Sequence, residues 1–84
     1  MKTLTLLVRA YCHLCDEMLA AVRPLATAHD AILEIIDVDA PAHAALEAAW
    51  GDQVPVLLAG PPRFRAIVCR YHFDRAAVER ALGG

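Results

Sequence analysis

Apolar and polar positions follow two different patterns along the first third of the chain. Residues 3–8, "TLTLLV", are an apolar run that predicts a first strand, which ends at Arg9. From residue 13 onward apolar side chains recur at steps of three and four, which predicts a helix. These positions are Leu14, Met18, Val22 and Leu25. Pro24 lies inside the pattern and removes a backbone hydrogen bond, so we expect the helix to kink or restart there.

The middle of the chain predicts a second strand and a second helix. Residues 31–39, "AILEIIDVD", are nearly continuously apolar, which is typical of a strand that helices cover on both faces. Asp39 is suited to capping a helix over residues 42–50, which begins near a proline and ends at Gly51.

The last third predicts two strands and a helix. Residues 54–60 and 64–71 flank a Gly-Pro-Pro turn and should form an antiparallel hairpin, and Asp74 should cap a helix over residues 75–82. The order is therefore β-α-β-α-β-β-α. The right-handed crossover rule makes the first two strands parallel neighbours. We expect an α/β domain over residues 1–84, with a four-stranded mixed sheet flanked by helices.

Composition excludes several classes of function. The chain has 84 residues and a formal net charge of -2, so it lacks the basic excess that a nucleic-acid partner favours. The apolar stretch Leu4 to Val8 is shorter than the roughly 7–15 residues of a signal peptide, and no stretch approaches the roughly 18 apolar residues of a membrane span. We therefore expect a cytoplasmic protein with no membrane contact. We also expect it to be a monomer.

Two of the three cysteines form a Cys-x-x-Cys pair, Cys12 and Cys15, at the start of the first predicted helix. In a reducing compartment a close pair is more often catalytic or metal-binding than structural. A zinc site would need further ligands, but the chain has no second Cys-x-x-Cys or His-x-x-x-His, only the scattered His43, His72 and Cys69. The pattern favours redox chemistry over zinc. Cys69, in the fourth predicted strand, fits a small buried hydrophobe.

The segments "CHLC" at 12–15 and "QVPVL" at 53–57, joined by a helix, a strand and a helix, resemble the glutaredoxin-like branch of the thioredoxin fold. The resemblance covers nearly the whole chain and implies a thiol–disulfide oxidoreductase. It also implies that Pro55 is cis and faces the cysteines. The Phe-Asp pair at 73–74 is similar to that of small bacterial glutaredoxin-like proteins of unassigned substrate.

The start of a helix suits the chemistry that the resemblance implies. Unpaired backbone N–H groups and the helix dipole favour an anion there, so Cys12 is the expected nucleophile and Cys15 the resolving thiol. A cationic His13 would stabilise the thiolate, whereas the acidic residues of the same turn oppose it. The backbone of Val54, before the cis proline, would pair with an extended substrate.

Three more residues are candidates for binding a substrate. Arg9 stands where glutaredoxins often carry a cation that holds a carboxylate of glutathione, although it could be a surface cation at a strand end. Tyr11 resembles the aromatic residue that some relatives place before the first cysteine, or it covers the apolar rim of the site. Asp74 matches the acidic residue that binds the other end of glutathione, but His72 and Phe73 occupy the family's two glycine positions. We therefore expect glutathione to be at most a weakly bound co-substrate, with no other cofactor.

The leading prediction is an oxidoreductase that acts on protein or small-molecule disulfides and is served by a thiol reductant system. Two alternatives remain from other classes. One is an iron-sulfur or metal carrier that uses Cys12 as a ligand, and the other is a non-catalytic binding module with a thioredoxin fold.

Overall fold

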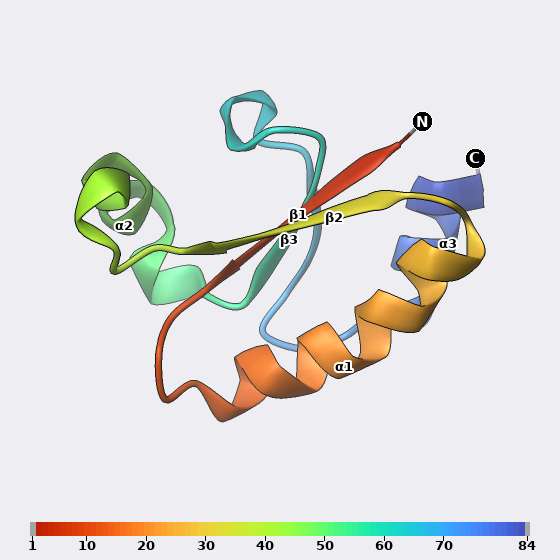
Figure 1. Cartoon of the computed structure of the whole chain (residues 1–84), viewed down its shortest axis with the longest axis horizontal. Coiled ribbons are helices and arrows are strands. Elements are labelled where there is room, and N and C mark those ends of the chain that lie inside the picture. The colour runs from red at the N-terminus through yellow and green to blue at the C-terminus, as the bar shows by residue number, and fades with distance from the viewer. Residues whose placement is uncertain (1, 84) are drawn as a thin grey trace.

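A computed structural model describes residues 2–83 and contains the predicted order of elements (Figure 1). The strands are β1 (Thr3–Val8), β2 (Ile32–Asp37), β3 (Val56–Ala59) and β4 (Ile67–Arg70), and the helices are α1 (His13–Ala28), α2 (Ala44–Trp50) and α3 (Arg75–Gly83). The strand order is β2-β1-β3-β4. Strand β1 is parallel to β2 and antiparallel to β3, which pairs antiparallel with β4. The predicted mixed sheet, with a parallel first pair and a final hairpin, is confirmed.

The helices cover opposite faces of this sheet, α1 and α3 on one and α2 on the other (Figure 1). Side chains alternate along β1, so that Leu4 and Leu6 face α1 and α3 whereas Leu7 faces α2. The larger core cluster consists of Leu4, Leu6, Met18, Val22, Leu57, Cys69, Val78 and Leu82, and the smaller one of Leu7, Val38, Trp50, Val56 and Leu58. Within residues 2–83, none of the helices combines the length and apolarity that crossing a membrane requires.

Thr5 is a fully buried polar residue of the central strand β1. Its hydroxyl donates a hydrogen bond of 2.8 Å to the carbonyl oxygen of Gly60, in the loop after β3. The backbone N–H of Gly60 donates in turn to the carbonyl of Thr3, at 2.8 Å. Both bonds fix this loop to β1, at the end of the sheet away from the cysteine pair.

The prediction that helices cover both faces of the second strand is wrong. Strand β2 lies at the edge of the sheet, and its residues Ile32 and Ile35 are 45% and 42% exposed. Helix α2 has seven residues and is therefore about 10 Å long, whereas the six residues of β2 extend over about 20 Å. The helix can cover only the part of β2 that leads into Val38, which is buried.

Local expectations also fail at two places. Asp39 does not cap α2, because a 3₁₀ turn at Pro41–His43 precedes that helix and its N-cap has no side-chain hydrogen bond. Strand β4 begins at Ile67 rather than at 64, since Pro62–Phe64 form another 3₁₀ turn and Arg65 adopts a left-handed backbone with φ of 53°. Helix α1 continues through Pro24 to Ala28, so it does not restart there, and the alternative of a kink stays a prediction.

Candidate functional site

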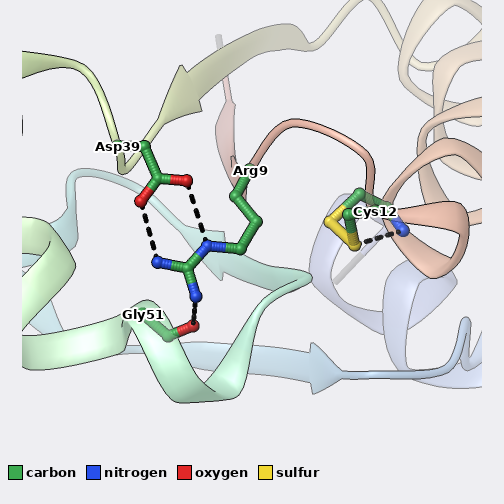
Figure 2. The surroundings of a disulfide bond; sticks show 5 residues. Arg9, Cys12, Asp39 and Gly51 are labelled. Atoms are coloured by element: carbon green, nitrogen blue, oxygen red, sulfur yellow. Dashed lines mark hydrogen bonds and ion pairs between the residues drawn. A yellow bond between two sulfur atoms is a disulfide. The ribbon is translucent and has the colours of Figure 1, made fainter.

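The cysteine pair lies where the loop after β1 enters α1. Cys12 is the N-cap residue of the helix, and its sulfur accepts a hydrogen bond from the backbone N–H of Cys15 at 3.1 Å (Figure 2). The two sulfurs form a disulfide. Cys15 is 2% exposed, whereas Cys12 is half-buried and reaches the surface. Residue Tyr11, with φ of 58°, turns the chain from the strand into the helix.

The Val54–Pro55 peptide bond is cis, as predicted. The bond lies just before β3, and the pairing of Val56 with Leu7 brings it to the end of β1 from which the cysteine loop departs. Pro55 is buried and Val54 half-buried. The carbonyl of Pro55 accepts a hydrogen bond of 2.8 Å from the N–H of Tyr71. The proline loop, the cysteine loop and the end of β4 therefore share one end of the sheet.

Arg9, the predicted carboxylate-binding residue, already binds a carboxylate of the chain. Its Nη2 and Nε donate to the two oxygens of Asp39 at 2.8 and 3.1 Å, and its Nη1 donates to the carbonyl of Gly51 at 2.9 Å. Figure 2 shows the guanidinium turned toward these partners and away from the disulfide. The hydrogen bond raises the pKa of Arg9 and lowers the pKa of Asp39. The carboxylates of Glu47 and Asp37 raise the pKa of Arg9 further.

Sequence reasoning missed both partners of Arg9. Asp39 stands before a proline and a run of alanines, which is also the signal for a helix N-cap. The Gly51 contact is made by a backbone carbonyl, which leaves no mark on the sequence. Arg9 thus joins the ends of β1, β2 and α2, three segments that lie far apart along the chain.

Next to Cys12, His13 lies 3.5 Å from the carboxylate of Glu17, one turn further along α1. Both side chains are largely exposed. Solvent screens such an exposed pair, so this contact is weak. The tuning of Cys12 by His13 stays a prediction.

A cavity of about 250 Å³ lies between α1 and the segment that leads from β4 to α3. Its lining residues are Leu14, Glu17, Met18 and Ala21 from the helix and Tyr71, His72 and Phe73 from the segment. Leu14, between the two cysteines in sequence, is 38% exposed. Tyr71 has a left-handed backbone with φ of 64°, and its hydroxyl donates to the carbonyl of Asp52 at 3.4 Å. We call this cavity the α1 groove; sequence reasoning did not find it.

Comparison with known protein families shows to which family this chain belongs. The sequence profile described as Glutaredoxin-like domain (DUF836) matches residues 3–83. The chain belongs to the glutaredoxin-like family. A solution NMR structure of protein Ne2328 from Nitrosomonas europaea is similar to it, with 32% sequence identity, a TM-score of 0.77, and coverage of 96% of this chain and 91% of that one. The predicted thioredoxin-like fold is thereby confirmed. Comparison with curated proteins gave no match.

The segment after β4 holds His72 and Phe73 in different environments. Phe73 packs against the larger core cluster, and His72 lies exposed at the wall of the α1 groove. The carboxylate of Asp74 accepts a hydrogen bond of 3.1 Å from the N–H of Ala77 and so caps α3, as predicted. Its expected contact with glutathione stays a prediction.

The remaining candidates of this glutaredoxin-like protein occupy different environments. Tyr11 is fully exposed, so it does not cover an apolar rim. Cys69 is free and buried, as predicted, and burial raises the pKa of its thiol. In residues 2–83 no group of three or more His, Cys, Asp or Glu side chains is arranged to hold a metal ion, so His43, His72 and Cys69 do not complete a zinc site with the pair.

Proposed function

We propose that this glutaredoxin-like protein is a thiol–disulfide oxidoreductase in which Cys12 is the nucleophile and Cys15 the resolving thiol. One observation carries the proposal: Cys12 reaches the surface at the N-cap of α1, while its bonded partner Cys15 is buried one turn further in. The N–H of Cys15 and the helix dipole both favour a thiolate at Cys12 in the reduced protein. An exposed anion beside a buried thiol is the arrangement that disulfide exchange requires.

The exchange proceeds in two displacements. The Cys12 thiolate attacks one sulfur of the substrate disulfide and forms a mixed disulfide, and the other substrate sulfur leaves as a thiolate that takes up a proton. Cys15 then loses its proton and attacks the Cys12 sulfur, which forms the Cys12–Cys15 disulfide and releases the second substrate thiol. The substrate gains two electrons and two protons. A cytoplasmic thiol reductant system must return them to the protein before the next cycle.

The surroundings of the pair support a polypeptide substrate more than glutathione. The backbone of Val54, next to the buried Pro55, is the proposed contact for an extended substrate chain. The side chains of His72 and Phe73 replace two glycines that would admit glutathione, and Arg9 is bound to Asp39. We propose glutathione as a weak co-substrate only.

Equilibration with redox buffers tests the proposal. Protein is incubated in mixtures of reduced and oxidised dithiothreitol, quenched with acid and alkylated, and its mass is then measured by mass spectrometry. We expect one two-electron transition, unchanged in Cys69→Ser and absent in Cys12→Ser and Cys15→Ser. The reduced protein should also reduce an added protein disulfide, whereas Cys12→Ser should not.

Two results would contradict the proposal. A pair that does not change state across the buffers would favour the binding module. A cluster-type absorption band in freshly purified protein that is lost in Cys12→Ser would favour the iron-sulfur carrier.

A further inference from the structure

Carboxylates predominate at the end of the sheet that holds the cysteine pair, which we call the dithiol end. It comprises the loops and helix turns at the C-terminal ends of β1, β2 and β4 and before β3. Its carboxylates are Asp16, Glu17, Asp37, Asp39, Glu47, Asp52 and Asp74, and its permanent cations are Arg9, Arg70 and Arg75. Seven negative charges against three positive ones make this end more acidic than the whole chain, whose net charge is -2.

Each of these three cations already has a hydrogen-bond or ion-pair partner, and for two of them the partner is a carboxylate. Arg9 donates to both oxygens of Asp39 and to a carbonyl. The guanidinium of Arg70 donates to the side-chain oxygen of Gln53 at 2.9 Å, and Arg75 lies 3.4 Å from the carboxylate of Glu79. At Arg9 and Arg75 an approaching anionic group must compete with a carboxylate that is already bound, which costs free energy. Arg70 keeps an uncompensated charge, but the carboxylates of this end outnumber it.

The α1 groove offers a different environment on the side of the helix. Leu14, Met18 and Phe73 form apolar walls, and the carboxylate in the lining belongs to Glu17. A side chain with an aliphatic stem and a cationic head fits this combination, because the stem contacts the walls while the head approaches the carboxylate. The exposed ring of Tyr71 adds a surface over which a cation is attracted.

We infer that the site selects disulfides flanked by basic side chains, with a lysine or arginine of a protein substrate placed in the α1 groove, and discriminates against acidic disulfides. This inference rests on the proposed disulfide exchange and names its substrate class. The charge at the dithiol end acts on the substrate as it approaches. The preference for basic over acidic disulfides should therefore weaken when salt screens this charge.

Three peptide disulfides of matched size test the inference. They are the disulfide dimers of N-acetyl-Cys-Lys-amide, N-acetyl-Cys-Gln-amide and N-acetyl-Cys-Glu-amide. Reduced protein is mixed with each at pH 8, above the usual titration range of histidine. Released peptide thiol is measured by chromatography after an acid quench, and each rate is divided by that of dithiothreitol with the same peptide to remove intrinsic reactivity. We expect the lysine dimer to react about fivefold faster than the glutamate dimer at low ionic strength, and the ratio to approach one at high salt.

Variants that remove one charge test which residues produce the preference for the lysine dimer. Glu17→Gln should lower the lysine preference about twofold, and Asp39→Asn, which frees Arg9, should raise the rate with the glutamate dimer about twofold. Glu34→Gln is the matched control, because it removes one exposed carboxylate from β2 away from the dithiol end and should change neither ratio. The rate with the neutral glutamine dimer shows that each variant remains folded and active.

The outcomes separate the inference from the function on which it rests. If the protein reduces the glutamine dimer but shows no normalised preference for the lysine dimer, the inference is wrong and the oxidoreductase function stands. The same holds if Glu34→Gln changes the rate ratios as much as Glu17→Gln and Asp39→Asn do. Failure to reduce any of the three dimers refutes both.

Discussion

The three cysteines should differ widely in their reaction with iodoacetamide once the protein is fully reduced. Cys12 reaches the surface at the N-cap of α1, Cys15 is 2% exposed and Cys69 is 8% exposed. Iodoacetamide reacts with the thiolate and needs access to it. A brief pulse at about pH 7 should therefore label Cys12 first.

The expected ratio follows from burial and charge. A thiol with the ordinary pKa of about 8.5 is roughly 3% thiolate at pH 7, and burial raises the pKa of Cys69, so its thiolate fraction is smaller still. Both buried thiols also need a local opening before the reagent can reach them. An opening that costs about 3 kcal/mol slows labelling by more than 100-fold. We expect Cys12 to react at least 100-fold faster than Cys15 or Cys69.

Mass mapping after the pulse measures this ratio. The reduced protein is desalted under argon, pulsed, quenched with excess thiol, denatured and blocked with a second reagent before digestion. The same pulse in denaturing urea is the control, because all three thiols are exposed there and should be labelled to similar extents. Cys12→Ser should leave the slow labelling of Cys69 unchanged. Labelling of Cys69 or Cys15 before Cys12 in the folded protein would refute the assignment of the nucleophile.

Two further predictions concern the stability of the fold. Thr5→Val should lower the free energy of unfolding in urea by about 1–2 kcal/mol, because the carbonyl of Gly60 loses its donor; a variant as stable as the parent would show that this bond contributes nothing. Asp39 should stabilise the fold above its unfolded pKa, about 3.9, and lose this contribution as pH falls through its lower folded pKa. The parent should therefore be more stable than Asp39→Asn at pH 7, and urea titrations below about pH 4 should show the difference closing; a constant difference would contradict the pairing with Arg9.

Local sequence patterns predicted the part of the site that depends on neighbours along the chain. An apolar run followed by a three- and four-residue periodicity places Cys12 at a helix start, and the same reasoning gave the cap at Asp74. The family resemblance, rather than any spacing, gave the cis bond before Pro55. The two predictions from local patterns, the helix start at Cys12 and the cap at Asp74, hold because they depend on neighbouring residues rather than on distant contacts.

The errors arose where a distant segment decides the outcome. Asp39 has the local signal of a helix cap, but the guanidinium of Arg9, 30 positions earlier, binds its carboxylate. The apolar run of β2 indicates a covered strand, but the short α2 leaves Ile32 exposed on its face of the sheet. Ile35 shares the opposite face with Leu6 and is exposed because β2 is an edge strand. Likewise, the α1 groove joins a helix to residues at least 50 positions away, and no local pattern records that contact.

In the proposed exchange the sulfur of Cys12 acts twice, since the atom that would attack the substrate is also the acceptor of the N–H of Cys15 in the first turn of α1. Its negative charge is present in the reduced protein, is neutralised in the mixed disulfide and returns only after reduction. A thiolate is a stronger acceptor for an N–H group than a neutral sulfur, so the end of the helix is held most firmly when the protein is ready to react. Each cycle of the proposed exchange would therefore weaken and strengthen the same helical turn that carries Cys15.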